Sequence, residues 1–152
     1  MKKEQPNPSL QTDKLPEELK LTYKCARKGS AVIEELKIAA ALKLWNDRGY
    51  RELGFEVPSD LSGKTFYVDV LAQDDRGFVG VECTPNLNLE RLRRQIKQLR
   101  HSLPPNSHTV IVFPENIGEQ TKKAVKLADE VWVTGKKGTI EQMMFMTVFR
   151  KG

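Results

Sequence analysis

Three closely spaced strand-like segments in the middle of the chain limit the fold more than any other feature of the sequence. They cover residues 51–57, 65–71 and 78–83, and each has the length and composition of a β-strand. The segments between them are short and rich in turn-forming residues. Strands joined this closely are predicted to form an antiparallel meander, whose first strand ends at Pro58.

Helices are predicted on both sides of the meander. Residues 31–48 are good helix formers that follow Ser30, a favourable N-cap, and stop at Gly49. Their apolar side chains occupy two faces, so this helix is predicted to be largely buried. Residues 87–103 repeat leucine or isoleucine on one face, as an amphipathic helix does. A shorter helix is expected at 17–24, after a loose N-terminal tail.

The C-terminal third adds a strand, a helix and a second strand. Residues 108–113 and 130–134 have the composition of buried strands and enclose a helix at 118–128, which implies parallel pairing. A capping-box pattern begins at Thr139 and predicts a final helix over 139–148, with a strand as the alternative. Large apolar residues in this region are expected either to widen the core or to form a homodimer interface; they are Met143, Met144, Phe145, Met146 and Phe149.

Length and charge limit the class of protein. The 152 residues suit one domain, with a tail and short helix over 1–26 and the domain over 27–152. A formal charge of +5 and a pI near 9.2 favour an anionic partner, most commonly nucleic acid.

No apolar run approaches membrane-spanning length and the start is not a secretory signal, so a cytoplasmic location without a membrane partner is expected. Cys25 and Cys83 lack zinc-type spacing and are expected to be reduced thiols.

Two acids interrupt the apolar strands of the meander. Asp69 lies within the second strand and Glu82 within the third. A carboxylate inside an apolar strand is costly unless something pairs with it. The short turn would place both acids close together on the sheet, where Mg²⁺ or Mn²⁺ would relieve their repulsion. The alternative is that each acid faces solvent beside a lysine or arginine.

The order of these features resembles the PD-(D/E)xK nucleases, and among them the archaeal Holliday-junction resolvases. The residues that carry the resemblance are Arg27 to Val32 with Glu34 just after, Gly49-Tyr50, Val68 to Ala72, and Val81 to Thr84. The resemblance covers residues 27–113. It implies an α/β fold with a restriction-endonuclease-like αβββαβ core, in which helices flank a mixed central sheet. It also implies Mg²⁺-dependent hydrolysis of DNA.

The resemblance implies roles for single residues as well. Asp69 and Glu82 would bind the metal and act in catalysis, joined by Glu34 or Glu35 from the first long helix. The family lysine, two residues after the glutamate, is Thr84 here, so cleavage is expected to be weak unless another lysine takes its place. The candidates for that lysine and for polar helper residues are Lys97, Lys64, Gln95 and Gln98.

Basic residues gather before the first long helix and along the helix at 87–103. In that second helix Glu90 is the only opposing charge. Cations and helix N-terminal amides bind phosphates, so contacts to the DNA backbone are expected; the residues are Arg27, Lys28, Ser30, Arg91, Arg94 and Lys97. A solvated surface is the alternative. No aromatic residue is interleaved with these charges, which favours duplex DNA over single strands.

The sequence leaves three functions open. The favoured one is a Mg²⁺-dependent endonuclease that acts on duplex or branched DNA with weakened activity. The second is a nuclease-fold module that binds DNA without cutting it. The third is an α/β protein-interaction domain in which the two acids are accidental.

Overall fold

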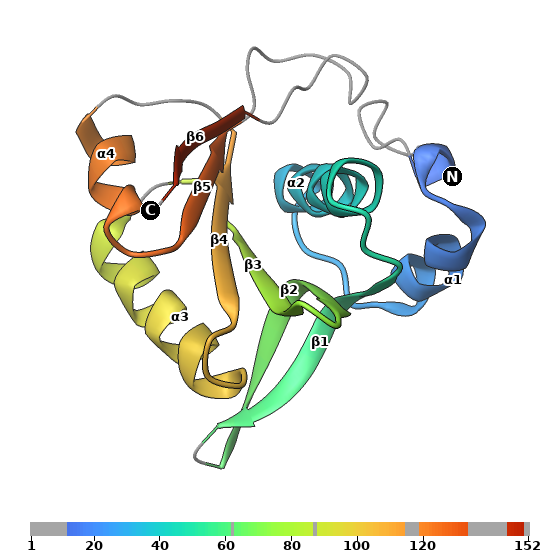
Figure 1. Ribbon diagram of the computed structural model, residues 1–152, viewed down its shortest axis with the longest axis horizontal. Coiled ribbons are helices and arrows are strands. Elements are labelled where there is room, and N and C mark those ends of the chain that lie inside the picture. The colour runs from blue at the N-terminus through green and yellow to red at the C-terminus, as the bar shows by residue number, and fades with distance from the viewer. Residues whose placement is uncertain (1–11, 62, 87, 115–118, 134–145, 151–152) are drawn as a thin grey trace, which may run out of the picture.

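The computed structural model describes residues 12–61, 63–86, 88–114, 119–133 and 146–150. The helices and strands up to β5 (Glu130–Val133) follow one another along the chain in the predicted order (Figure 1). The elements are η1 (Thr12–Lys14), α1 (Glu17–Cys25), α2 (Ala31–Leu42), η2 (Lys43–Asp47), β1 (Glu52–Leu61), β2 (Lys64–Asp74), β3 (Gly77–Cys83), α3 (Leu89–Ser102), β4 (His108–Phe113), α4 (Glu119–Val125), β5 (Glu130–Val133) and β6 (Met146–Arg150).

The strands form one six-stranded sheet in the sequential order β1-β2-β3-β4-β5-β6. β1, β2 and β3 make the predicted antiparallel meander. β4 and β5 continue the sheet parallel to β3, and β6 pairs antiparallel with β5. The predicted α/β class, with a mixed central sheet flanked by helices, is therefore confirmed.

Helices cover both faces of the sheet. Figure 1 shows α1 and α2 on one side and α3 and α4 on the other. Side chains between α1, α2 and the sheet form one apolar cluster, here called the α2-side cluster. Those between α3, α4 and the sheet form the α3-side cluster, to which α3 contributes Leu92, Ile96 and Leu99. α2 is buried along most of its length, as its two apolar faces predict. None of the described helices is long and apolar enough to cross a membrane.

Two element boundaries differ from the sequence predictions. β1 continues through Pro58 to Leu61, and proline is tolerated there because β1 is an edge strand of the sheet. The helix expected over 31–48 is α-helical only to Leu42 and continues to Asp47 as the π-helical turn η2.

The C-terminal helix prediction is wrong where the structure describes this segment. Residues 146–150 form strand β6 on the free edge of β5. Thr147, Val148 and Phe149 are β-branched or aromatic and favour a strand once a neighbouring strand is available. The rest of that predicted helix, including Met143, Met144 and Phe145, lies outside the described residues.

The hairpin of β1 and β2 changes sides of the sheet at Glu56 and Asp69. Residues two apart in a regular strand face the same side. Here the pairs on either side of the crossing are Phe55–Val70, in the α2-side cluster, and Val57–Val68, which packs with the α3-side cluster. Glu56 therefore lies opposite Asp69. Glu56 also has a φ of 50°, a left-handed conformation that is uncommon for a residue with a side chain.

A buried acid, Glu130 of β5, contacts Arg48, the residue after η2, and His108 at the start of β4. Its carboxylate accepts two hydrogen bonds from Arg48, at 2.8 and 3.0 Å, and one from Trp132 Nε1 at 3.0 Å. His108 Nε2 lies 2.5 Å from the same carboxylate. Burial alone would raise the pKa of Glu130, but the hydrogen bonds from His108, Arg48 and Trp132 outweigh it and hold the pKa well below its usual range. Glu130 is therefore ionised inside the fold.

Candidate active site

The two acids predicted from the sequence meet where the hairpin changes sides. Pairing between β2 and β3 ends at Val70–Val81, so Asp69 and Glu82 are the next residues along the two strands. Asp69 Oδ2 accepts a hydrogen bond from the N–H of Cys83 at 2.7 Å. The Asp69 carboxylate therefore occupies the point where β2 and β3 separate. Asp69 is partly exposed, whereas Glu82 is buried.

Burial and mutual repulsion both oppose ionisation of these acids. Burial raises the pKa of Asp69 to about 7; the Cys83 N–H works against this rise and Glu56 adds to it. Burial also raises the pKa of Glu82 well above its usual range, and the charges of Asp69 and Glu56 add to that rise. Arg91 of α3 acts in the opposite direction. Because these carboxyls repel one another, a bound cation would stabilise their ionised forms.

A fully buried lysine lies beside the acids. Lys37 of α2 has 0% of its surface exposed. Its Nζ lies 2.9 Å from Glu34 Oε2 and 3.2 Å from Glu56 Oε2. Glu56 in turn lies opposite Asp69 in the hairpin, close enough to raise the pKa of that carboxyl. The four side chains therefore form a continuous polar chain from α2 to β2.

Glu34 has further partners at the N-terminal end of this chain. Its Oε1 accepts a hydrogen bond from the Tyr23 hydroxyl at 2.6 Å, and its Oε2 accepts one from the Gly29 N–H at 2.6 Å. Burial alone would raise the pKa of Glu34, but Gly29, Tyr23 and Lys37 outweigh it and the pKa lies below its usual range. Glu34 is thus an ionised carboxylate with its contacts already made.

The structure brings Asp69 and Glu82 together, and Glu34 reaches them through Lys37 and Glu56. In the part of the chain that the structure describes, no three His, Cys, Asp or Glu side chains converge as a ready metal site. Asp69 and Glu82 nevertheless fit Mg²⁺, which proteins usually hold with one or two carboxylates together with water and substrate phosphates. Glu35, the other predicted ligand, is the next residue of α2 and is half-buried.

Sequence reasoning missed Lys37 and Glu56. Lys37 has a signal that would have found it, because it interrupts the apolar run of α2 three residues after Glu34. The same kind of interruption identified Asp69 and Glu82 in the strands. Glu56 has no such signal. It reaches the site because β1 changes sides of the sheet at its left-handed backbone, and nothing in the local sequence indicates that change.

The lysines proposed from the sequence lie elsewhere. Lys97 is exposed on α3, and Lys64 is exposed at the start of β2. Of the proposed helpers on α3, Gln95 is half-buried and Gln98 is exposed. Thr84, at the family lysine position, donates a hydrogen bond from its hydroxyl to the Asn86 carbonyl at 2.7 Å. Among these positions the structure gives no lysine a contact with Asp69 or Glu82.

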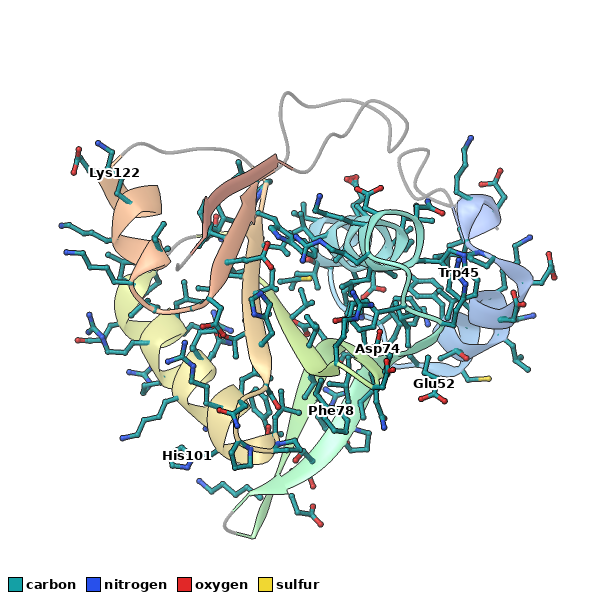
Figure 2. All side chains as sticks on the ribbon, in the orientation of Figure 1. Trp45, Glu52, Asp74, Phe78, His101 and Lys122 are labelled. Atoms are coloured by element: carbon teal, nitrogen blue, oxygen red, sulfur yellow. The ribbon has the colours of Figure 1, made fainter. Side chains whose placement is uncertain are left out.

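Lys97 instead lines a basic pocket of about 250 Å³ between α3 and the end of α4. Arg93, Lys97 and Arg100 follow one flank of α3 at helical spacing. Figure 2 shows His101 at one end of this helical layer and Lys122 of α4 at the other. No acidic side chain is among the described residues of the lining, which are Arg93, Ile96, Lys97, Arg100, His101, Lys126 and Leu127.

The remaining predicted DNA-binding residues have varied surroundings. Arg91 and Arg94 are exposed on α3. The Arg27 guanidinium lies 3.9 Å from the ring centre of Tyr67, on the β2 surface near Asp69. Lys28 donates to the carbonyls at the end of α1, which stabilises that helix end. Ser30 is the predicted N-cap of α2, and its Oγ accepts the Ile33 N–H at 3.4 Å.

Comparison with solved structures supports the fold. A XisH-family protein from Nostoc punctiforme superposes with a TM-score of 0.52 at 12% sequence identity, and the match covers 73% of this chain and 95% of that protein. An fdxN element excision controlling factor protein from Anabaena variabilis superposes with a TM-score of 0.52 at 12% identity, covering 77% of this chain and 97% of that one. No family model matches the sequence, and no curated protein matches it significantly. The likeness supports a fold shared with these proteins, a mixed sheet flanked by helices, and leaves function to the site.

Proposed function

We propose that this chain is a metal-dependent endonuclease that binds duplex or branched DNA and hydrolyses its phosphodiester bonds. The observation that carries the proposal is the pair of acids, Asp69 and Glu82, at the point where β2 and β3 separate. Acids whose ionisation is opposed by burial and by each other destabilise a fold and are typical of functional sites. Mg²⁺ or Mn²⁺ would satisfy both carboxylates.

Each residue around the pair has a task in that reaction. Asp69 and Glu82 would hold the cation, which when bound neutralises phosphate charge and supplies an activated water. Glu56 would limit the positions open to the Asp69 carboxylate, which it faces across the hairpin. Arg91, whose charge lowers the pKa of Glu82, would attract a phosphate group toward the pair.

The DNA-binding part of the proposal is supported by α3. This helix carries five cations, and none of them takes part in an ion pair within the described part of the chain. Unneutralised positive charge along one helix attracts a polyanion such as the DNA backbone. These residues are Arg91, Arg93, Arg94, Lys97 and Arg100.

A cleavage assay tests the proposal. Duplex, flap and four-way-junction DNA would be incubated with Mg²⁺, with Mn²⁺ or with EDTA. We expect metal-dependent product from the wild type and none from Asp69→Asn. Asp75→Asn serves as the matched control, because Asp75 is exposed in the turn between β2 and β3. Absence of product on every substrate with both metals would rule out the endonuclease function.

A second function, DNA binding without cleavage, is favoured by one observation. The family lysine position holds Thr84, and the buried Lys37 already has protein partners. Salt-sensitive binding in EDTA, together with no product under any metal condition, would establish this second function.

A further inference from the structure

Lys37 is a costly residue for this fold to bury. Lysine is almost never fully buried unless it is paired, because the ammonium group loses its hydration. Replacement of such a pair by apolar side chains often leaves stability unchanged or improved. The position of Lys37 beside the acids is therefore better explained by function than by stability.

The hydrogen-bond donors of Lys37 are fully used. Its ammonium group contacts Glu34 Oε2 at 2.9 Å, Glu56 Oε2 at 3.2 Å and the Arg27 carbonyl at 3.4 Å. An ammonium group has three donors, and these three contacts account for all of them. Lys37 therefore acts through its neighbours and has no donor left for a substrate.

Glu56 is the neighbour that needs support. Its left-handed backbone conformation, with a φ of 50°, is unfavourable for a residue with a side chain and persists only when surrounding contacts impose it. Those contacts are Lys37 on one side and Asp69 on the other. Removal of the Lys37 ammonium would free the Glu56 carboxylate to move, and Asp69, which keeps its hydrogen bond from the Cys83 N–H, would lose a fixed neighbour across the hairpin.

We propose that Lys37 is the positioning residue of this site: it holds Glu56 against Asp69, and Glu34 anchors Lys37 instead of binding metal. The inference rests on the proposed metal site at Asp69 and Glu82. It assigns to α2 the supporting cation that Thr84 does not supply. Residues outside the ligand set that keep a metal ligand in place typically contribute about 10 to 100-fold in metal affinity or activity, and we expect an effect of that order from Lys37 acting through Glu56.

The first test compares Lys37→Met with Lys37→Arg. Mn²⁺ affinity of the full-length chain would be measured by calorimetry, and single-turnover cleavage at saturating DNA and metal would be measured beside it. For Lys37→Met we expect Mn²⁺ binding weakened by about 10 to 100-fold, with cleavage reduced similarly and DNA affinity in EDTA unchanged. Removal of a positive charge alone would tighten cation binding, so weaker binding reports a failure of positioning. Lys37→Arg should recover part of the loss.

Lys24→Met is the matched control for charge. Lys24 is exposed on α1, and its replacement changes the net charge equally without touching the polar chain. We expect wild-type Mn²⁺ binding and cleavage from this variant.

Glu34→Gln separates an anchor from a metal ligand. The glutamine carbonyl oxygen can still accept from Lys37 and the Gly29 N–H while its amide group donates to the Tyr23 hydroxyl oxygen, so an anchor role predicts that Mn²⁺ affinity stays within a few-fold of the wild type. A ligand role predicts loss of Mn²⁺ binding. If Lys37→Met alone fails to fold, the double variant Glu34→Gln/Lys37→Met removes both charges of the buried pair, and it should fold with weakened Mn²⁺ binding.

The outcomes distinguish this inference from the proposed function. Wild-type Mn²⁺ affinity and cleavage in folded Lys37→Met would overturn the positioning role while the endonuclease stands. Loss of Mn²⁺ binding in Glu34→Gln would also overturn it, because Glu34 would then be a ligand. A wild type that cuts no DNA but loses Mn²⁺ affinity on Lys37→Met would leave the positioning role intact and remove the endonuclease. No Mn²⁺ binding by the wild type overturns both.

Discussion

Protons and metal ions should compete for the carboxyl groups of Asp69 and Glu82. The pKa of Asp69 is raised to about 7 and that of Glu82 is raised as well, both above the values of roughly 3.9 and 4.3 expected in an unfolded chain. At a pH between the unfolded pKa values and the raised pKa values of the fold, the folded state binds more protons than the unfolded state. The free energy of unfolding should therefore fall, through these two groups, as pH rises from about 4 to about 7.

A metal ion should offset that loss. We expect Mg²⁺ or Mn²⁺ to raise the unfolding temperature more at about pH 8 than at about pH 6, because at lower pH a proton occupies Asp69. A metal concentration 100 times its Kd would add about 2.7 kcal/mol to the free energy of unfolding. Asp69→Asn should remove the shift, and Asp75→Asn should keep it. An equal shift in the wild type and Asp69→Asn would place the metal elsewhere.

Glu130 should show the opposite pH dependence. Its pKa is lowered in the fold, so its contribution to stability is fully present above roughly pH 4.3, its unfolded pKa, and is lost as pH falls further. Glu130→Gln leaves Arg48 without its charged partner and should lower the free energy of unfolding by about 3 kcal/mol at neutral pH.

Urea denaturation at neutral and acid pH measures both effects. The variant should lose less stability than the wild type on acidification, because the group that titrates is gone. Parallel pH profiles for the two proteins would show that another carboxylate dominates acid unfolding.

Single site residues could be predicted where a charged side chain interrupts an otherwise apolar strand or helix. Asp69 and Glu82 were identified because each interrupts an apolar strand, and the structure places them side by side. Lys37 interrupts an apolar helix in the same way but was overlooked. Glu56 could not have been found, because a left-handed residue inside a strand changes which way its neighbours face.

At the scale of elements, α3 presents two flanks with different surroundings. Arg91 begins the flank that continues through Gln95 and Gln98, and it lies near enough to Glu82 to lower its pKa. Arg93, Lys97 and Arg100 follow the other flank and line the pocket with Lys126. A strand of DNA that reaches the acid pair would pass Arg91 and could be held further along by this pocket.

Charge reversal in the pocket tests that path. Lys97→Glu/Lys126→Glu should weaken duplex binding in EDTA and reduce the slope of log affinity against log salt by about 0.9 for each phosphate group that is no longer bound. Fluorescence anisotropy over a range of salt concentrations provides the measurement.

The matched control is Lys122→Glu/Lys123→Glu, which makes the same change of charge on exposed residues of α4 outside the pocket. It should keep the wild-type salt slope. Equal weakening in the two double variants would mean that overall charge, and not the pocket, attracts DNA.

Elements with strong local signals were predicted well and those decided by distant partners were not. The meander, α3 and β4 have clear periodicity or turn residues, and all three were found. β6 was predicted as a helix because its partner, the edge of β5, is not visible in the local sequence. β1 was expected to end at Pro58 because its position at the sheet edge, where proline is tolerated, is a property of the whole sheet.

At the scale of the whole molecule, assembly remains a prediction. Cleavage of both strands of a duplex or junction needs two sites, which a homodimer would supply. The apolar C-terminal residues that suggest a dimer include Met143, Met144 and Phe145, which lie outside the described part of the chain. We expect a dimer by sedimentation of the intact chain at micromolar concentration. A single monomeric species would remove the dimer and imply that strands are cut one at a time.

The side change of the β1–β2 hairpin has a consequence for how the protein unfolds. One hairpin supplies Phe55 and Val70 to the α2-side cluster and Val57 and Val68 to the cluster on the other face. Neither cluster can come apart without loosening the strands that complete the other, so the two cores should melt in a single cooperative transition. Glu56 and Asp69 sit where the hairpin crosses between them. The backbone amides of Glu56 and Asp69 should therefore exchange with solvent as slowly as those of the core strands. Partial opening at either face of the sheet should leave Glu56 paired opposite Asp69.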